Sequence, residues 1–441
     1  MLCSIKRVSE MNHNRRMSLA TMTPGKGSEM TRRKFRISQR RSLTQNIVYT
    51  IFWPIIFAIE DVFTFPHRRS YIGFILFCGF AGWTFIPQFG SDSYYYAALV
   101  NKLKTADDFG SLEPIIAILV RVVVLLYGDY HLYFMLVGFI YGTVVVCCAR
   151  LLFRGVPINL PMNIASQVFM LAFLLNYLVF DALNSRYYFG MWVLLLATIL
   201  MTKGRIQLAF FVASLGTMVH YGHSIFLFAL VILFFSRGFG KAQIVFAYIL
   251  LLVAFSMPSS TLISLGEIVS HNSSGTFNEK VGHTVRNANQ AQLMMETGPD
   301  NSSWFIQLYQ RPIFISLMIS GHLLWWKIRK HQTASQYQLF VLIIIMWALC
   351  FALSGDQDAA VRIEANTLAL LLLWHACWFL YRKHKNTFAL YINAIPMALY
   401  LVVTLRRSLD GASLAVLLPT IFIWFERVMP TIPNFFLKFH F

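Results

Sequence analysis

The sequence predicts an all-α polytopic membrane protein with about 11–14 hydrophobic helices. The chain is 57% hydrophobic and 13% charged, with a mean hydropathy of +0.59, whereas soluble domains carry about 25% charged residues. Stretches such as 71–89, 160–180 and 243–265 are long enough to cross a bilayer, which takes about 20 mainly apolar residues. These stretches are continuous and rich in Leu and Phe instead of alternating in polarity, so they indicate helices.

The apolar segments form a single predicted transmembrane domain over about 45–429, and no internal repeat divides it. A basic tail, 1–44, precedes this domain and a short tail, 430–441, follows it. The polar connections 90–112 and 266–304 are the longest, and long loops usually carry function or are disordered. We expect both on the outer side, because the basic loops alternate with them. The predicted segments are 46–60, 70–89, 113–127, 130–150, 161–181, 186–202, 205–220, 222–236, 242–265, 305–326, 337–354, 362–381, 387–404 and 412–429.

The net charge of +18 comes from basic residues that are distributed as in a membrane protein, so we expect no nucleic-acid partner. Eleven Lys and Arg residues lie in 1–44, which we expect to be disordered. Further basic residues fall in alternate short loops, which the positive-inside rule places in the cytoplasm. The loops at 184–186, 220–223, 266–304 and 355–358 are then expected outside. The basic loops are those at 150–154, 203–205, 237–241, 327–330 and 382–385.

The six cysteines include no Cys-x-x-Cys pair, and five of them lie in apolar segments. We therefore expect neither a disulfide framework nor a zinc site. We also expect no cofactor.

Two early segments are too short or too interrupted for simple spans. Segment 113–127 has about 15 residues and carries Arg121 near its middle, so we expect a helix that lies in the membrane interface within the first outer loop. Because a helix in this position does not cross the membrane, Asp92 and Arg186 remain on the same side of it. Segment 46–60, interrupted by Pro54, is either a second interfacial helix, which we favour, or a span that leaves the basic tail outside.

Three stretches carry the motifs that suggest a function. In the first, 84–96, an apolar helix runs into an acidic and aromatic loop that contains Asp92; in the second, Glu113-Pro114 opens the short apolar helix. In the third, 184–190 opens a span with Asn-Ser-Arg, and 220–224 closes the following span with His-Tyr-Gly-His-Ser.

The order and spacing of these stretches, over about 70–236, resemble the EpsG-like and Wzy-type polysaccharide polymerases of bacterial envelopes. The first two stretches also look like the opening of the GT-C glycosyltransferases, so the resemblance implies a GT-C-like fold. The sequence departs from that pattern at Asp92, where many GT-C enzymes show an acidic pair. Its C-terminal half does not match residue by residue.

The resemblance implies catalytic roles for three residues. Asp92 would act as the base for the attacking sugar hydroxyl, with Glu113 as a second candidate. Arg186, at the start of a helix, would offer a bidentate fork to a diphosphate leaving group. The structural alternatives are a solvated loop carboxylate for Asp92, a charge at a helix N-terminus for Glu113 and an interface anchor for Arg186.

Further polar residues are candidates for binding the substrate. His220 and His223 would share a helical face and contact the diphosphate or deliver a proton, with structural histidines as the equal alternative. Asp358 and Arg362 are spaced to pair with each other, although Arg362 is also a candidate diphosphate ligand. Tyr95 could stack on a sugar ring. The candidate substrate-binding residues are therefore His220, His223, Asp356, Asp358, Arg362 and Tyr95.

The expected function is that of a metal-independent membrane glycosyltransferase in the bacterial inner (cytoplasmic) membrane. It would join undecaprenyl-diphosphate-linked oligosaccharide repeat units at the outer face, for capsule, exopolysaccharide or O-antigen synthesis. The expected partners are the polyprenyl-diphosphate-linked oligosaccharide, the lipid bilayer, and a chain-length regulator and flippase of the same pathway. The alternatives are an O-antigen ligase, which uses the same donor, and a lipid-linked glycan flippase or other transporter, which should show inverted repeats and broken helices.

Overall fold

The computed structural model describes 53–64, 71–87, 91–102, 113–126, 128–153, 164–256, 311–329, 333–353, 357–380 and short pieces between 394 and 417. All of these belong to one compact unit, Phe52–Phe441. The predicted tails 1–44 and 430–441 and the predicted loop 266–304 lie outside the described residues.

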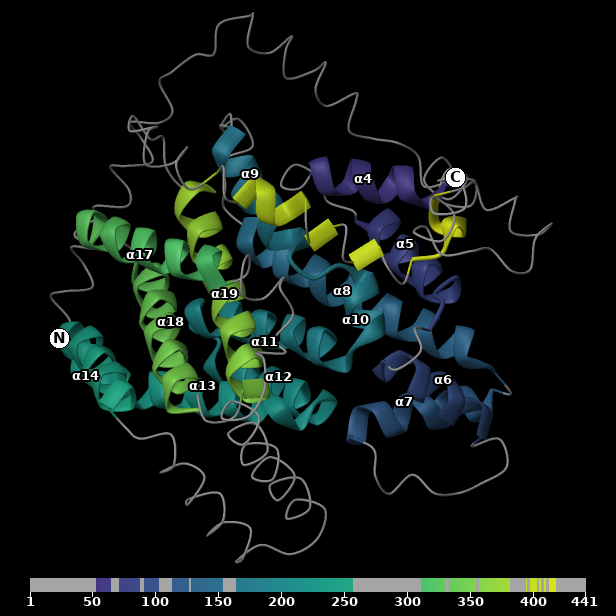
Figure 1. Cartoon of the computed structure of the whole chain (residues 1–441), viewed down its shortest axis with the longest axis horizontal. Helices are drawn as coiled ribbons and strands as arrows, with labels where there is room; N and C mark the ends of the chain where they lie inside the picture. Colours follow the sequence, from purple (N-terminus) through teal and green to yellow (C-terminus); the bar gives the residue numbers. More distant parts are fainter. Residues whose placement is uncertain are drawn as a thin grey trace, which may run out of the picture. The chain divides into compact units, whose positions relative to one another are not determined.

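All regular elements in this described part of the chain are helices, as the sequence predicts. In chain order they are α4 (Pro54–Thr64), α5 (Ile72–Trp83), α6 (Asp92–Lys102), α7 (Pro114–Leu125), α8 (Tyr130–Phe153), α9 (Ile164–Leu175), α10 (Val179–Asn184), α11 (Arg186–Thr202), α12 (Ile206–Val219), η1 (Tyr221–His223), α13 (Ser224–Ser236), η2 (Arg237–Ala242), α14 (Gln243–Ser256), α17 (Arg311–Ile328), α18 (Ala334–Ala352), α19 (Gln357–Leu380) and η5 (Leu414–Leu417) (Figure 1).

Three stretches of the described helices are long and apolar enough to cross a membrane: Tyr130–Leu152, Tyr221–Ser256 and Ala334–Ala352. Several other apolar helices are shorter, among them α5, α7, α11 and α12. The all-α class is therefore confirmed, and the membrane is supported by the length and composition of these helices.

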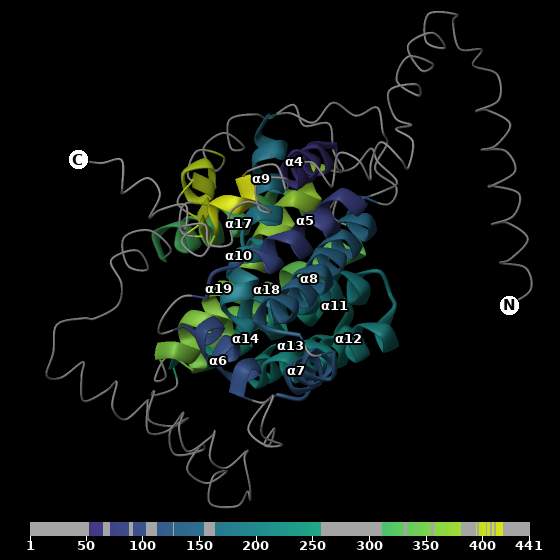
Figure 2. The same cartoon turned by 90° about the vertical axis from the view of Figure 1, so that its right-hand side faces the viewer.

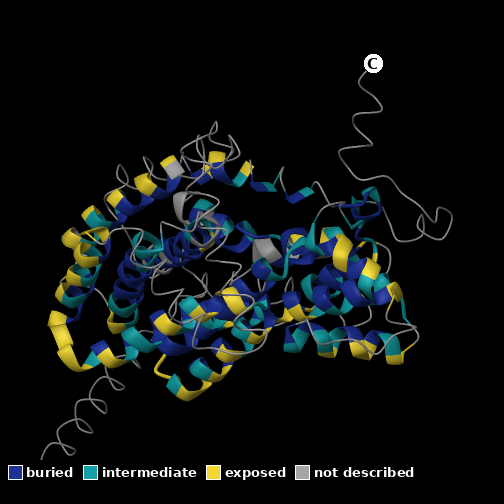
Figure 3. Ribbon diagram, turned by 60° about the horizontal axis from the view of Figure 1, so that its bottom comes forward, coloured by how far each residue is buried: buried dark blue, intermediate teal, exposed yellow. Residues whose placement is uncertain are grey.

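Exposed positions, yellow in Figure 3, run along the peripheral helices, and many of the exposed residues are large and apolar. On α14, Ile249, Leu252 and Phe255 are all more than half exposed, and on α17 Ile319 and Leu323 are as well. A water-soluble monomer rarely exposes contiguous apolar patches of this kind, so these faces suit contact with lipid.

Helices α5 and α8 pack with their backbones in close approach, because glycines line the contact. A Cβ added at Gly82 would lie 2.1 Å from the carbonyl oxygen of Phe134, and one at Gly138 would lie 2.1 Å from that of Cys78. With Gly142, Gly138 forms a Gly-x-x-x-Gly pattern, which lets apolar helices approach at van der Waals distance.

Helix α11 lies at the centre of the described fold, packed against α8, α12 and α18. Its Trp192 is fully buried, and the indole N–H donates a hydrogen bond to the carbonyl of Tyr177 at 3.1 Å. Helix α18 in turn packs against α14 and α19, and α19 packs against α9. The N-terminus of α11, which carries Arg186, is therefore fixed by packing on several sides.

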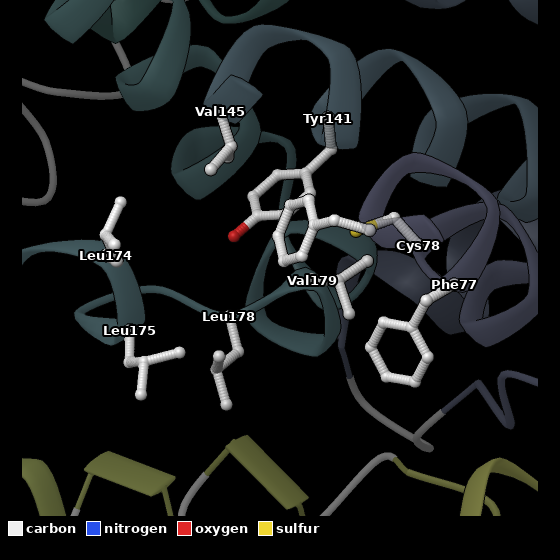
Figure 4. Close-up of a pocket in the computed structure, with 9 residues that line it drawn as sticks. Phe77, Cys78, Tyr141, Val145, Leu174, Leu175, Leu178 and Val179 are labelled. Atoms are coloured by element: carbon white, nitrogen blue, oxygen red, sulfur yellow. The ribbon is translucent and has the colours of Figure 1, made fainter. Parts of the chain in front are cut away.

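The predicted continuous span 161–181 was wrong, because the helix is interrupted between α9 and α10. At the break, the Tyr177 carbonyl accepts hydrogen bonds from the Tyr141 hydroxyl at 2.6 Å and from Trp192, which replace a helical donor. The Asp181 carboxylate accepts from the Leu178 N–H at 3.0 Å and restarts the helix. Beside the break lies an apolar cavity of about 30 Å³, lined by Tyr141, Cys78 and their neighbours (Figure 4).

The predicted loop 90–112 was wrong over 92–102, which forms α6. Asp92 lies in the first turn and Lys102 in the last, and both charges suit the helix dipole. Ser93, Tyr96, Ala97 and Val100 form its buried face, at the spacing of one side of a helix. Similarly, the predicted loop 355–358 overlaps the start of α19 at Gln357, so Asp358 is helical.

The two ends of α11 carry different chemistry. At its C-terminal end, Arg237 donates hydrogen bonds to the Met201 carbonyl at 3.1 Å and to the side chain of Gln338 at 2.7 Å. Lys203 and Arg205 are exposed at the same end. Because the 17 residues of α11 rise about 25 Å, these basic loops lie far from Arg186.

Candidate active site

The site is built around the N-terminus of α11. Ser185 is the N-cap residue: its backbone is extended, and its hydroxyl accepts the N–H of Tyr187 at 3.4 Å while donating to the Asp92 carboxylate at 3.2 Å. The neighbouring Asn184 accepts a hydrogen bond from the Ser93 hydroxyl at 2.9 Å. Two consecutive polar residues therefore fasten the start of α6 to the start of α11.

Arg186 joins the other two motifs. Its guanidinium forms an ion pair and hydrogen bond with Glu113, the N-cap residue of α7, and its Nε lies 3.9 Å from the Asp92 carboxylate. The Glu113 side chain is only 3% exposed, that of Arg186 24% and that of Asp92 41%. The three predicted catalytic residues thus meet at one point, where Asp92 is the carboxylate most open to solvent.

Aromatic rings of α6 and α8 form the wall behind Arg186. The guanidinium carbon lies 5.5 Å from the ring centre of Tyr96, within the range of a cation–π interaction, and Tyr96 packs against Tyr133. Burial raises the pKa of the Tyr96 phenol, and the nearby Arg186 charge only partly opposes that rise in pKa. Next to this buried ring, Tyr95 is half exposed and lies edge-on to it.

A second group of residues surrounds Tyr187, the next residue of α11. The His223 ring stacks on Tyr187 with centroids 4.6 Å apart and lies within hydrogen-bond distance of the Tyr187 carbonyl, at 2.9 Å. The His220 ring meets Tyr187 edge-on at 5.5 Å. From α19, Arg362 lies over the Tyr187 ring at 5.8 Å, and its carbonyl accepts the Tyr187 hydroxyl.

Gly190 makes room for this arrangement. A Cβ at position 190 would lie 2.6 Å from the imidazole of His223, so a larger residue on this face of α11 would displace the ring. His223 is fully buried as a result.

The structure therefore brings together most of the predicted site residues. Asp92, Glu113 and Arg186 form one cluster, and His220, His223 and Arg362 surround the adjacent Tyr187. Asp356 lies outside the described residues, and Asp358 is described in its backbone alone. In the described part of the chain, no group of three His, Cys, Asp or Glu side chains is arranged to hold a metal ion.

Sequence reasoning missed several residues that organise the site. The motif at 184–190 includes Asn184 and Ser185, but it does not predict their hydrogen bonds to α6. A Ser directly before an apolar helix is a recognisable N-cap signal, and a Gly inside a helix, such as Gly190, is a signal of close packing. No comparable signal marks Tyr187, because tyrosine is common in the interfacial ends of membrane helices.

No protein-family model, curated protein or solved structure matches this chain.

Proposed function

We propose that this chain is an integral membrane glycosyltransferase that joins lipid-diphosphate-linked oligosaccharide units, as a polysaccharide polymerase of the bacterial inner membrane. The observation that carries the proposal is the junction of Asp92, Glu113 and Arg186, three charged residues from distant parts of an apolar chain. Ion pairs inside an apolar protein are costly to assemble, so charged residues that are kept together in such a place are candidates for chemistry.

In this proposal Asp92 is the general base. Its carboxylate is the more exposed of the two, and Ser185 and Arg186 hold it in place from one side. It would take the proton of an acceptor sugar hydroxyl while that oxygen bonds to the anomeric carbon of the donor. The bond from the anomeric carbon to the lipid diphosphate breaks in the same reaction, and the diphosphate leaves with the electron pair.

Glu113 has a different proposed role. Because its side chain is buried and engaged with Arg186, it holds the guanidinium beside Asp92 and does not act as a second base. The exposed ring of Tyr95 is the proposed stacking surface for the acceptor sugar. The outward apolar faces of the helices would let the lipid tails of both substrates remain in the bilayer.

The proposal is tested by Asp92→Asn in cells that lack the chromosomal gene. Asparagine keeps an oxygen that can accept from Ser185 but cannot take a proton, so we expect normal protein levels and single repeat units in place of long polymer. Asp129→Asn is the matched control, because the Asp129 oxygen only accepts the N–H groups of His131 and Leu132 at the start of α8. Long polymer made by Asp92→Asn at normal protein levels would exclude Asp92 as the base.

One observation favours the second candidate, a lipid-linked glycan flippase. The break between α9 and α10 is the kind of discontinuity that transporters show in membrane helices.

The two functions differ in which lipid-linked glycans accumulate in cells that lack the protein. Without a polymerase, single lipid-linked units collect at the outer face and an impermeant glycosidase digests them in spheroplasts; without a flippase, they remain protected inside. If the chain is instead an O-antigen ligase, its deletion would leave long polymer that stays attached to its lipid.

A further inference from the structure

Three loops of the chain carry basic residues without any acidic ones. The stretch 187–266 contains four Lys or Arg residues and no Asp or Glu, and the stretch 312–355 contains three Lys or Arg residues and again no Asp or Glu. All seven lie at or beside the ends of helices, at 203–205, 237–241 and 327–330. The positive charge of these loops is therefore not balanced by carboxylates of the same stretches.

The first turns of α18 hold the first two of these loops together. The Ser335 hydroxyl donates a hydrogen bond to the carbonyl of Thr202 at 2.7 Å, and the Tyr337 hydroxyl donates one to the carbonyl of Lys241 at 3.2 Å. The two hydrogen bonds of Arg237 join the end of α11 to α18 as well. Two loops that lie more than 30 residues apart in the chain are thus fastened beside each other on the start of one helix.

Four of the seven cations are exposed within the described part of the chain: Lys203, Arg205, Lys241 and Arg329, which together form the basic rim. None of the four makes an ion pair with a carboxylate of the described residues. Arg237 differs from them, because it is only partly exposed and its two hydrogen bonds hold it in place. It positions the loops, whereas the four cations of the basic rim are open to an anionic partner.

Large apolar rings lie close to the basic rim. Phe235, at the end of α13, and Phe239, in η2, are both more than half exposed. Trp326 is also more than half exposed, and the guanidinium carbon of Arg329 lies 5.6 Å from the centre of its ring. Arg329 comes four residues before Thr333, the N-cap residue of α18, so the third loop leads to the same helix start. Rings and cations together at the ends of apolar helices are typical of the boundary between hydrocarbon and lipid headgroups.

The turn at η2 is open on its outer side. Residues 238–242 are all exposed, and a Cβ added at Gly238 or Gly240 would have no heavy atom within 4 Å. Gly240 has a φ of 55°, a conformation that favours glycine and ends the helical path before α14 begins. This turn presents an apolar ring and a cation, Phe239 and Lys241, two residues apart on one open surface.

We propose that the basic rim binds the phosphate headgroups of anionic glycerophospholipids, while Phe239 and Trp326 lie against their acyl chains. A soluble acidic partner would match the cations and leave these rings in water, and a zwitterionic lipid would match the rings and leave the cations without a net opposite charge. The inference goes beyond the proposed function, because it involves neither substrate of the glycosyltransferase reaction.

The test titrates phosphatidylglycerol, and separately phosphatidylcholine, into the full chain in micelles of a nonionic detergent. We expect the natural chain to bind phosphatidylglycerol at least tenfold more tightly, by a margin that falls as salt is added. Each Lys or Arg near a membrane surface contributes roughly a factor of five to the binding of anionic lipid. Arg205→Gln combined with Lys241→Gln should therefore weaken the binding of phosphatidylglycerol at least tenfold and leave that of phosphatidylcholine unchanged.

The matched control is Arg121→Gln combined with Lys102→Gln. It also removes one exposed Arg and one exposed Lys, but these lie on α7 and α6, whose starts contact the opposite end of α11. The control variant should bind phosphatidylglycerol with the affinity of the natural chain. An equal loss in the control variant and in the variant of the basic rim would overturn the proposal, because any cation would then serve.

Two further results would overturn the proposal: equal affinity of the natural chain for the two lipids, or displacement of phosphatidylglycerol by an equal concentration of soluble glycerol phosphate, which would identify a site for free anions. If the double variant of the basic rim does not fold, its two single substitutions replace it, each with a severalfold expected loss. Polymer length in cells is scored separately. A chain that prefers phosphatidylglycerol but leaves polymer length unchanged when deleted would keep the basic rim and exclude the polymerase.

Discussion

At the scale of single residues, the Glu113 and Arg186 pair shows why charge is kept inside an apolar fold. The Glu113 carboxylate is almost fully removed from solvent, so its only compensation is what the protein supplies, and Arg186 supplies a full charge. Removing one member of such a pair leaves the other uncompensated, which costs more than the pair contributes when intact. The pair also links residues 73 positions apart, at the starts of α7 and α11.

A double-mutant cycle tests this account of the pair. Arg186→Gln leaves Glu113 buried without its cation, and we expect it to lower the free energy of unfolding by on the order of 2–3 kcal/mol, less than for a fully buried pair because Arg186 is partly exposed. Glu113→Gln combined with Arg186→Gln should recover part of this loss while polymer synthesis stays absent. Unfolding in mixed micelles gives the stabilities. Additive losses in the double variant would mean that the two residues do not interact.

At the scale of helices, prediction succeeded where local sequence decides the structure. Helix α11 has the bounds predicted for its segment, because Ser185 caps its start and Gly204, with φ of 79°, follows its end in a conformation that favours glycine. Helix α6 was missed because its apolar face is short and interrupted by hydroxyl groups. It is recognisable only once Tyr96 and Val100 have partners in the fold.

The break between α9 and α10 could not be predicted for a similar reason. The segment is apolar throughout, and the groups that compensate for the interrupted helix come from Tyr141 and Trp192, which are 36 and 15 residues away from Tyr177. The same limit applies to the site. The motifs named Asp92, Glu113 and Arg186 separately, but pattern and resemblance did not show that Arg186 is held by both carboxylates.

The glycine contact between α5 and α8 gives a prediction at this scale. Gly138→Ala would place a Cβ 2.1 Å from a backbone carbonyl of α5, and backbone cannot move aside as a flexible side chain can. We expect overpacking to lower stability by about 1–3 kcal/mol and to reduce the yield of folded protein. Gly238→Ala is the control, because a Cβ there has no heavy atom within 4 Å. Equal thermal stability of both variants in detergent would show that α5 and α8 do not pack this closely.

At the scale of the whole molecule, the described helices separate an acidic and aromatic end from a basic end. Arg186 and its partners lie at the start of α11, and the basic loops at 203–205 and 237–241 gather at its other end. Under the proposed function, the positive-inside rule predicts that the basic end lies in the cytoplasm and that the site opens to the outer face. This is where a lipid-linked sugar chain that has already been moved across the membrane would be found.

Helix α7 is the element on which this orientation depends most. It starts at Glu113, in contact with Arg186, and its end leads through 128–129 directly into α8. The start of α8 is also near the site, because Tyr133 packs against Tyr96, whose ring lies beneath Arg186. Twelve residues of helix rise about 18 Å, less than the roughly 30 Å of a hydrocarbon core. In both views α7 lies beside α6 (Figures 1 and 2).

These facts predict that α7 enters and leaves on the same side of the membrane. In a background without native cysteines, Lys102→Cys before α7 and Asp129→Cys after it should both react with a membrane-impermeant thiol reagent in intact spheroplasts. Tyr221→Cys, exposed beside the histidines, should react with them, whereas Lys203→Cys at the basic end should react only after the membrane is opened. If Lys102→Cys and Asp129→Cys label from opposite sides, α7 spans the bilayer.

A spanning α7 would place Glu113 and the start of α8 on opposite sides of the membrane. The site formed by Asp92, Glu113 and Arg186 could then not exist as described. Labelling of Lys203→Cys in intact spheroplasts, with none of Tyr221→Cys, would keep the site and place it in the cytoplasm, where it would meet lipid-linked sugars before they cross.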